Sequence, residues 1–451
     1  MRAVVVALGK VGLPLAAKLT LAGHEVVGCD IDPHVRETVA AGRSPFPGES
    51  GLDAALTRAV GLGLLRTAGD TAAAIATHRP ALIVAVPPLY VDDDAQPAWA
   101  ALDAVCADIA RGLRDGLEAR REHQDNPPVV AIETTVPVGT TRERIAPALT
   151  EGSGGLIDGV DFHTVFSPER VFSGRALADL DAYPKLVGGL TAHGERRAVA
   201  CYRHFLKAEV RGLGSAEAAE LAKLAETTYR DINIAFANEL AIYAERLGVD
   251  VLQVIDAANS QPYSHIHRPG IAVGGHCIPV YPRFLLAGDP QARLPAVARE
   301  INDAMPAHAA GLLGDVRGRR VLILGVAYRG GVRETAFSGA LALRTSLVEH
   351  GAHVVAADPL YDDAALAALG FEPWDGGPID AAVLQADHPE YRSLTAAALP
   401  GVKVIVDGRG VLDPAAFAGV PVHRIGRPDA AARDAGSTIV PGPDTLGSRP
   451  G

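Results

Sequence analysis

The stretch "RAVVVALGKVGLPLAAKLTLAGHEVVGCDID", Arg2 to Asp32, decides the fold. An apolar, β-branched run up to Leu8 predicts a buried strand, and the glycines after it predict a tight turn. The following residues are helical in character up to Gly23, and "HEVVGCDID" predicts a second strand that ends at Asp30. A strand, a glycine turn, a helix and a strand ending in an acidic residue form the first unit of a dinucleotide-binding sheet.

The glycine turn is a GxGxxG fingerprint in which alanine takes the first position: Ala7, Leu8, Gly9, Lys10, Val11 and Gly12. Gly9 lets the backbone approach a pyrophosphate, and Gly12 lets the helix pack closely on the strand. A carboxylate at Asp30 accepts hydrogen bonds from a ribose diol and repels a 2′-phosphate, which favours NAD over NADP. The alternative is an α/β turn that binds no nucleotide.

The rest of the chain predicts a helical segment between two α/β units. Further strands are expected at 81–86 and 128–136, and 215–248 predicts one long helix that Gly248 ends. A second α/β unit follows, with "RRVLILGVAYRGG", "AHVVAADP" and "VKVIVDGRG" as strands and "ALALRTSLVEHG" as a helix. The chain after Gly426 is rich in Gly, Pro, Asp and Ser, which predicts a loose tail.

Composition narrows the class of protein. The 451 residues are 48% hydrophobic and carry a net charge of -11. No run of Lys and Arg stands out, so nucleic acid is not an expected partner. No stretch of 18 uncharged apolar residues and no signal-peptide core is present, which predicts a cytoplasmic protein without a membrane contact. The four cysteines show no CxxC spacing, and three of them, Cys29, Cys106 and Cys201, are expected in the core.

The fourth cysteine lies in "GIAVGGHCIPVYP", residues 270–282, which has neither helical nor strand periodicity. Cys277 is therefore expected in a tight, irregular loop rich in glycine and proline. Three histidines nearby, His265, His267 and His276, leave a metal site as an alternative, although HxH followed by HC lacks a standard ligand spacing.

Seven motifs together resemble those of the nucleotide-sugar 6-dehydrogenases, which act on UDP-glucose, GDP-mannose and UDP-N-acetylhexosamines. In chain order they are "GKVGLP", "ETTVPVGTT", "FSPERV", "ELAKLAETTYRDINIAFANEL", "PGIAVGGHCIPVYP", "REINDAMP" and "VLILGVAYRG". The resemblance covers roughly residues 1–425, and "GGHCIPV" is most similar to the UDP-N-acetyl-mannosamine and -glucosamine branch. It implies two Rossmann-like α/β domains joined by a long central helix. The implied ranges are 1–210 for NAD binding, 211–312 for helical dimerisation, 313–426 for the nucleotide sugar and 427–451 for a flexible tail.

The resemblance also implies a reaction, in which C6 of a UDP-linked, N-acetylated hexose is oxidised to a carboxylate with two NAD. A thiolate that adds to the intermediate aldehyde gives a thiohemiacetal, which can release a second hydride and become a thioester. Cys277 is the implied nucleophile, Lys223 the partner of the C6 oxygen and Glu169 the carboxylate that handles the hydrolytic water. Thr135 is implied beside the nicotinamide ribose. The implied substrate-binding residues are Arg170, Val171, Thr227, Arg230, Tyr263, Gly274, Tyr328 and Arg329.

Several family positions are changed in this chain. The family's Asn is Thr227, its Asp after the cysteine is Tyr281, and its two arginines are Tyr263 and Ala336. Removing charges from a diphosphate site is not neutral. A diverged relative that stops at the aldehyde, or that acts on an unusual nucleotide sugar in secondary metabolism, therefore stays open as an alternative. A two-electron 3-hydroxyacid dehydrogenase, a further alternative, would have no use for Cys277.

Overall fold

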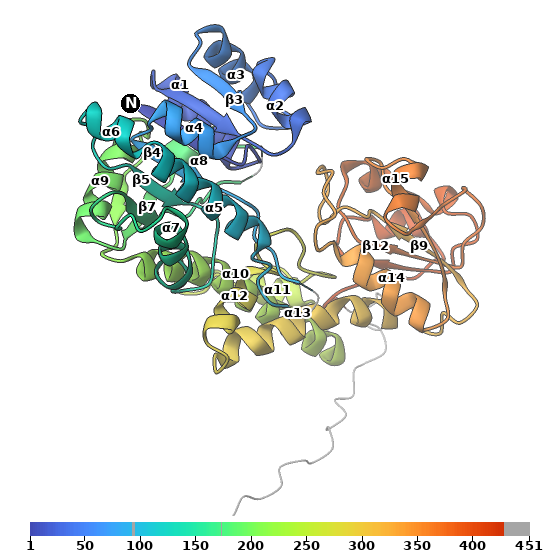
Figure 1. Cartoon of the computed structure of the whole chain (residues 1–451). Helices are drawn as coiled ribbons and strands as arrows, with labels where there is room; N and C mark the ends of the chain where they lie inside the picture. Colours follow the sequence, from blue (N-terminus) through green and yellow to red (C-terminus); the bar gives the residue numbers. More distant parts are fainter. Residues whose placement is uncertain (93–94, 173, 428–451) are drawn as a thin grey trace, which may run out of the picture. The chain divides into compact units, whose positions relative to one another are not determined.

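The computed structural model describes residues 1–92, 95–172 and 174–427. The chain forms two compact units. Figure 1 shows the chain coloured from the N-terminus to the C-terminus. The first unit contains Met1–Glu226 and Arg283–Gln291, and the second contains Thr227–Pro282 and the chain from Ala292 onward. The predicted tail, 427–451, lies outside the described residues except for Arg427.

The first unit is built on an eight-stranded sheet in the order β3-β2-β1-β4-β5-β6-β7-β8. All neighbouring strands are parallel except β6 and β7, which are antiparallel. The order 3-2-1-4-5-6 is that of a doubly wound dinucleotide-binding sheet. The strands are β1 Arg2–Val6, β2 Glu25–Cys29, β3 Leu65–Ala68, β4 Leu82–Ala85, β5 Val129–Ile132, β6 His163–Phe166, β7 Lys185–Gly189 and β8 Val210–Gly212.

Helices connect these parallel strands, as crossover connections require. Helix α1 packs on α3 and α8, while α5 packs on α4 and α7. Most apolar residues of β1, α1 and α3 are buried, and many of them form one core cluster with apolar residues of α9. The helices are α1 Gly12–Leu21, α2 Pro33–Ala40, α3 Leu52–Gly61, α4 Thr71–His78, α5 Ala100–Asp115, α6 Leu117–Glu122, α7 Ala146–Gly152, α8 Ala176–Ala182 and α9 Ala192–Arg203.

The predicted long helix is confirmed as α10, Ala216–Leu247. It ends where Gly248 takes a φ of +68°, a left-handed conformation that glycine adopts without strain. The boundary between the two units falls within this helix, between Glu226 and Thr227. Three further helices follow: α11 Val251–Ala258, α12 Tyr281–Gly288 and α13 Arg293–Gly311.

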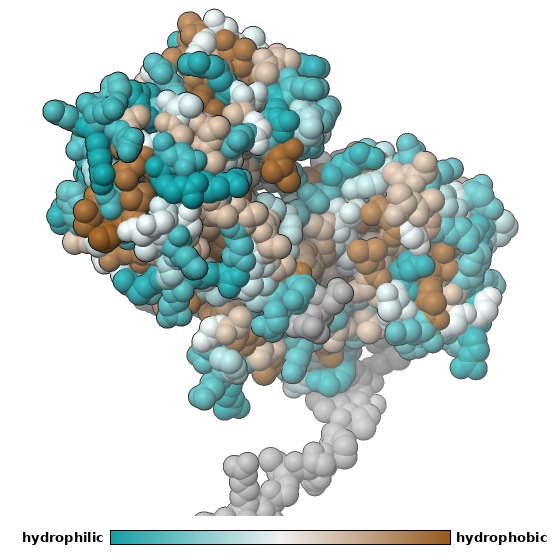
Figure 2. Space-filling model, viewed as in Figure 1, coloured by the Kyte–Doolittle hydropathy of each residue, from teal (hydrophilic) through white to brown (hydrophobic). Residues whose placement is uncertain are grey.

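The second unit contains a six-stranded, all-parallel sheet in the order β11-β10-β9-β12-β13-β14. The predicted second α/β unit is therefore confirmed, and the chain is of the α/β class. On the face shown in Figure 2, hydrophilic residues cover much of both units, as expected when apolar side chains fill the cores. The elements are β9 Arg320–Leu324, α14 Gly339–Glu349, β10 His353–Ala357, α15 Asp363–Ala368, β11 Glu372–Pro373, β12 Ala381–Leu384, β13 Val404–Asp407 and β14 Val422–Arg424.

The two sheets repeat one local device, an aspartate that follows the second strand and holds the turn after the first. Asp30 accepts a hydrogen bond from the backbone N–H of Leu8 at 2.8 Å. Asp358 occupies the equivalent place after β10 and accepts from Val326 at 2.7 Å and Ala327 at 3.1 Å. Each carboxylate thereby fixes the loop at the carboxyl end of the central strand of its sheet.

Candidate active site

The turn between β1 and α1 forms an open cradle. A Cβ at Gly12 would lie 2.0 Å from the carbonyl oxygen of Ala7, so only glycine allows the helix to start this close to the strand. A Cβ at Gly9 would meet no protein atom within 4 Å, so the space above this backbone is free. Lys10 is exposed and Val11 is half-buried. An open glycine backbone at the start of α1 fits the pyrophosphate of a dinucleotide.

Ala7 stands in the left-handed region, with a φ of +72°. An L-residue other than glycine adopts this conformation at a cost of roughly 1 kcal/mol or more. The backbone N–H of Ala7 donates to the carbonyl of Cys29 at 2.8 Å, which ties the turn to the second strand. The replaced first glycine thus keeps the backbone shape of the fingerprint despite its side chain.

Asp30 lies at the rim of the cradle and is half-buried. One carboxylate oxygen accepts from Leu8, and the other accepts from the N–H of Asp32 at 2.9 Å. Each oxygen of a carboxylate can accept a second hydrogen bond, so Asp30 keeps capacity for a ribose diol. The geometry therefore fits the predicted role of this residue.

Arg36 is a further residue of the cradle that the sequence analysis missed. Its guanidinium donates to the backbone carbonyls of Asp30 at 2.8 Å and Ile31 at 2.9 Å. A basic residue six positions after the acidic one was the signal that could have revealed it, because this region surrounds the 2′-position of the ribose.

A buried network of charged side chains includes Glu169, one of the predicted catalytic residues of the first unit. The ammonium of Lys185 contacts Glu133 at 2.7 Å and Glu169 at 2.8 Å, and the hydroxyl of Tyr202 donates to Glu133. Burial raises the pKa of Glu133, and Lys185 opposes only part of this rise. Burial alone would lower the pKa of Lys185, but the two carboxylates outweigh it and raise that pKa. Lys185 is therefore charged and holds Glu169 in place.

Lys223 is only 8% exposed, so its side chain does not extend from the surface of the helix into solvent. Its ammonium donates to the backbone carbonyl of Glu169 at 2.7 Å. The side chain of Glu169 accepts from the N–H of Arg170 at 2.7 Å as well as from Lys185. Two of the predicted catalytic residues, Lys223 and Glu169, are thus adjacent in the first unit.

The other predicted residues of this unit are less free to act on a ligand. Arg170 donates to Glu226 at 2.7 Å and to the carbonyl of Pro184 at 3.3 Å. Val171 packs against the core, and Thr135 is only 5% exposed after β5. The strand predicted at 128–136 is shorter in the structure and ends at Ile132; the backbone N–H of Glu133 makes a last ladder bond to the carbonyl of Ala85 at 3.0 Å, and the chain then turns away through Thr134 and Thr135.

Cys277 lies in the second unit and is the exposed cysteine of the four; Cys29, Cys106 and Cys201 are buried as predicted. Burial raises the pKa of both Cys29 and Cys106 to about 12, so neither is a nucleophile near neutral pH. The loop around Cys277 is irregular, as expected, and the carbonyl of Cys277 accepts from the N–H of Tyr281 at 2.9 Å.

Close packing and a buried polar chain fix this loop. A Cβ at Gly274 would lie 2.7 Å from the Cβ of Tyr328, and Gly275 adopts a φ of +88°. The N–H of Gly270 donates to Asn238 at 2.9 Å, and Asn238 donates in turn to Asn302 at 2.8 Å. The chain continues through buried Asp231 to Arg299. A thiol on a loop held in this way has a defined position, which a nucleophile requires.

The predicted substrate-binding residues of the second unit differ in exposure. Tyr263 is 93% exposed, whereas Thr227 is only 4% exposed, and Arg230 is half-buried. The Nε of Arg329 donates to the hydroxyl of Tyr328 at 2.9 Å. The Nε2 of His276 lies 3.3 Å from a carboxylate oxygen of Glu334. Within the described residues, no three His, Cys, Asp or Glu side chains lie close enough together to hold a metal ion.

Comparison with known proteins adds independent information. Sequence models of the UDP-glucose/GDP-mannose dehydrogenase family match in order along the chain: the NAD binding domain at 1–206, the central domain at 217–304 and the UDP binding domain at 322–414.

None of the helices in the described parts of the chain is long and apolar enough to cross a membrane.

Individual relatives share most of the chain. A UDP-N-acetyl-D-mannosamine dehydrogenase of Pyrococcus horikoshii is 34% identical over 428 residues, which covers 91% of this chain and 96% of that protein. An NDP-N-acetyl-D-galactosaminuronic acid dehydrogenase of Ralstonia solanacearum is 31% identical, with 90% and 95% covered. The solved structure of the Pyrococcus horikoshii UDP-D-ManNAc dehydrogenase superposes with a TM-score of 0.83 at 32% identity, covering 95% of this chain and 99% of that one. The chain belongs to the UDP-glucose/GDP-mannose dehydrogenase family and is an NAD-dependent oxidoreductase that acts on the alcohol of a nucleotide sugar.

Proposed function

We propose that this enzyme oxidises the C6 alcohol of a UDP-linked, N-acetylated hexose to the carboxylate in two successive steps. The observation that carries the proposal is the exposed Cys277 on a tightly fixed glycine loop, in a chain whose other cysteines are buried. A single oxidation of an alcohol needs no nucleophile, whereas oxidation of an aldehyde through a covalent adduct does. The names of the relatives from Pyrococcus horikoshii and Ralstonia solanacearum support an N-acetylated sugar.

In the proposed mechanism, NAD bound at the Gly9 cradle supplies the hydride acceptor for both oxidations. The ammonium of Lys223, held by the carbonyl of Glu169, stabilises negative charge on the C6 oxygen. The thiolate of Cys277 adds to the aldehyde carbon and, after the second oxidation, carries the product as a thioester. Glu169 accepts a proton from the water that breaks the carbon–sulfur bond, releasing the carboxylate and the thiol. Lys185 keeps Glu169 oriented for this step.

The substrate carries a group that the common UDP-sugars lack, because the second unit has exchanged charge for aromatic surface. Tyr263 and Tyr281 replace charged family residues, and a tyrosine can stack or hydrogen-bond but cannot neutralise a phosphate. The cations that take over the diphosphate are Arg329 and Arg333. The Nε of Arg333 donates to the carbonyl of Leu360 at 3.0 Å, and its guanidinium lies 5.0 Å from the centre of the Tyr361 ring, so two contacts position it for a phosphate.

The test is incubation of the enzyme with NAD and a panel of UDP-, GDP- and dTDP-sugars, followed by mass spectrometry. A uronic acid product with about two NADH formed per sugar is the expected result. Free aldehyde with one NADH per sugar would refute the two-step reaction. Efficient turnover of plain UDP-glucose would refute the altered substrate pocket while leaving the reaction class intact.

The cradle predicts a preference for NAD that Asp30 and Arg36 jointly determine. We expect Asp30→Ala to narrow the ratio of kcat/KM for NAD over NADP by roughly 10–100-fold, because a charge-assisted hydrogen bond to the ribose is lost. The guanidinium of Arg36, already held at the carbonyl of Asp30, then accommodates the 2′-phosphate. Adding Arg36→Gln should remove the gained NADP activity. Asp32→Ala, which removes only the cap of α2, is the matched control; an unchanged ratio in Asp30→Ala would contradict the assignment.

A homodimer formed through α10 is the proposed assembly. Three large side chains lie seven residues apart on this helix and are about half exposed in the single chain: Tyr229 at 57%, Phe236 at 49% and Tyr243 at 52%. A seven-residue repeat places side chains on one face of a helix, and such an exposed aromatic row marks an interaction surface. A second copy of the helix would cover it.

Phe236→Glu combined with Tyr243→Glu should therefore convert the dimer into a monomer, since two buried like charges would face each other across the axis. Light scattering after size exclusion measures the change. The control is Leu62→Ser, which removes an apolar side chain that is 61% exposed in the first unit. A wild-type species with the mass of one chain at micromolar concentration would contradict the dimer.

The division of the chain into 1–210, 211–312 and 313–426 is part of the same proposal, with the tail from 427 outside the functional domains. A cytoplasmic location is proposed as well. The free thiols of Cys29, Cys106 and Cys201 suit a reducing compartment.

A further inference from the structure

A second cavity opens at the edge of the first sheet opposite the NAD cradle. Gly9 and Asp30 follow the carboxyl ends of their strands, whereas this cavity is formed where strands begin, by Arg2 on β1 and Glu25 on β2. Its volume is about 400 Å³. Ligands of doubly wound sheets bind at the carboxyl ends of the strands, so this cavity is not part of the dinucleotide site.

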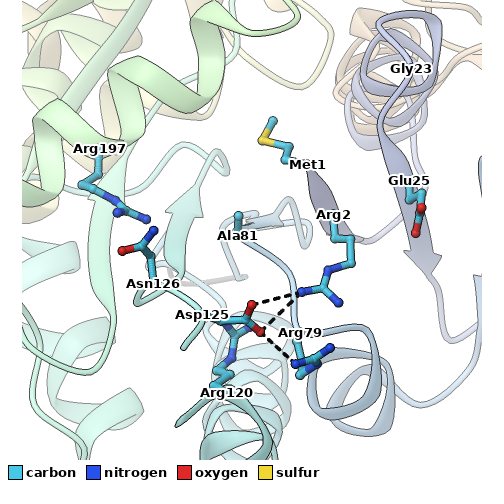
Figure 3. A pocket seen from close by; sticks show the side chains of 10 residues that line it. All are labelled: Met1, Arg2, Gly23, Glu25, Arg79, Ala81, Arg120, Asp125, Asn126 and Arg197. Carbon is cyan, nitrogen blue, oxygen red and sulfur yellow. Dashed lines mark hydrogen bonds and ion pairs between the residues drawn. The ribbon is translucent and has the colours of Figure 1, made fainter. Parts of the chain in front are cut away.

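The lining is strongly basic. Four arginines, from β1, the end of α4, α6 and α9, face only two carboxylates, which leaves an excess of two positive charges among the side chains: Arg2, Arg79, Arg120 and Arg197 against Glu25 and Asp125. Figure 3 shows Arg2 and Arg79 converging on Asp125, at 3.4 and 3.2 Å. Asp125 therefore pairs with two guanidinium groups at once. Among the described residues, no carboxylate forms an ion pair with Arg120 or Arg197.

Arg120 is the decisive residue, because it is 94% buried. One of its terminal nitrogens donates to the carbonyl of Pro80 at 2.7 Å, but its Nε has no hydrogen-bond partner within the described chain. Burial lowers the pKa of Arg120 to about 10; the charge of Asp125 opposes part of this shift, and those of Arg2 and Arg79 add to it. A buried guanidinium that is only partly satisfied is costly, and an anion in the cavity would offset that cost.

We propose that this cavity is a binding site for a small phosphorylated anion, separate from the NAD and nucleotide-sugar sites. Guanidinium groups bind phosphate oxygens through paired hydrogen bonds, and three of the four arginines are anchored by a backbone carbonyl: Arg120 on Pro80, Arg79 on Ala119 and Arg197 on Pro127. No aromatic residue lines the cavity, so the ligand is recognised by its charge and not through a stacked base. An anion bound there would bridge residues that lie on or next to β1, β4, β5 and α9. The same part of the sheet carries the NAD cradle at its other edge.

The test is titration calorimetry of the intact enzyme with inorganic phosphate, pyrophosphate and glucose 6-phosphate at constant ionic strength. NADH and UDP are present at saturation, so that the cradle and the sugar-nucleotide site are occupied. One binding event per chain is expected. Tighter binding of pyrophosphate would identify a diphosphate ligand, and tighter binding of glucose 6-phosphate a phosphate monoester.

Arg79→Gln and Arg197→Gln should each weaken the binding by roughly 10–100-fold, because each removes a charge-assisted contact. Both variants leave Arg120 unchanged, so the test does not require that this buried residue tolerates a substitution. Arg58→Gln, an exposed arginine on α3, should leave the affinity unchanged. The affinity for NADH should be the same in all variants. Absence of binding under saturation with NADH and UDP, or equal binding in wild type, Arg79→Gln and Arg197→Gln, would overturn the proposal.

Discussion

Cys277→Ala should lower the rate of uronic acid formation by at least roughly 1000-fold, because the variant lacks the exposed thiol that forms the covalent adduct in the proposed second oxidation. The structure supports this expectation by elimination, since the thiols of Cys29, Cys106 and Cys201 are buried. The first oxidation needs no thiol, so the variant should still reduce NAD slowly and release aldehyde. Product analysis by mass spectrometry, with NADH counted by absorbance, separates the two steps.

Cys201→Ala is the matched control, because it removes a thiol of the first unit that no step uses. Cys277→Ser should retain the loop geometry and replace the thioester by a more slowly hydrolysed ester. An ester of the chain that survives denaturation would support the position of residue 277 as the nucleophile. Unchanged acid formation in Cys277→Ala would remove this residue from the mechanism.

Lys185→Met should destabilise the protein by about 3–5 kcal/mol, the usual cost of breaking a buried ion pair by removing one partner. It leaves the side chains of Glu133 and Glu169 without the ammonium that pairs with both of them. Calorimetric unfolding measures the loss. Lys185→Arg, which keeps the charge, should lose much less. Adding Glu133→Gln to Lys185→Met should restore part of the stability, because one of the two uncompensated charges is gone.

The loss of stability in Lys185→Met should change with pH in a direction that follows from the pKa of Glu133. Burial raises the pKa of Glu133 above its ordinary value of 4.5, so the folded state binds more protons than the unfolded state above that pH. Stability therefore falls as pH rises through this window, and the fall should be steeper without Lys185. Acid formation should also decline, since Glu169 loses its orienting partner. A destabilisation below about 1 kcal/mol at neutral pH would show that the pair is not a structural unit.

Local patterns predicted the fold because they reflect local physics. The apolar runs, the glycine turn before Gly12 and the helix ended by Gly248 were all visible in the sequence. Lys185 was not, because its partner Glu133 lies 52 positions away and nothing in "AYPKLVGG" marks a buried cation. The strand predicted at 128–136 is too long because its β-branched residues Thr134, Thr135 and Val136 favour a strand locally, whereas the chain leaves the sheet after Ile132.

The basic cavity shows the same limit more sharply. The sequence has no run of Lys and Arg, which argued against nucleic acid as a partner, and it gave no sign that Arg2, Arg79, Arg120 and Arg197 meet in one cavity. They come from four separate elements, and only the order of strands in the sheet brings these together. The residue pattern therefore predicted the irregular loop around Cys277, but it could not predict a charge cluster that the topology of the sheet assembles.

Asp358, the counterpart of Asp30 in the second sheet, bears on the order in which the reactants come and go. It is only 7% exposed, and it accepts from Val326, Ala327 and Leu360 as well as lying 3.1 Å from His388. Burial and the three partners of its Oδ2 leave Asp358 without an open face for a ribose diol, so this aspartate does not repeat the cradle around Asp30. If the cradle at Gly9 serves both oxidations, as we propose, the first NADH has to depart before the second NAD arrives. In the proposed mechanism the half-oxidised sugar waits through that exchange, and its covalent bond to Cys277 would keep a reactive aldehyde from diffusing away in the interval.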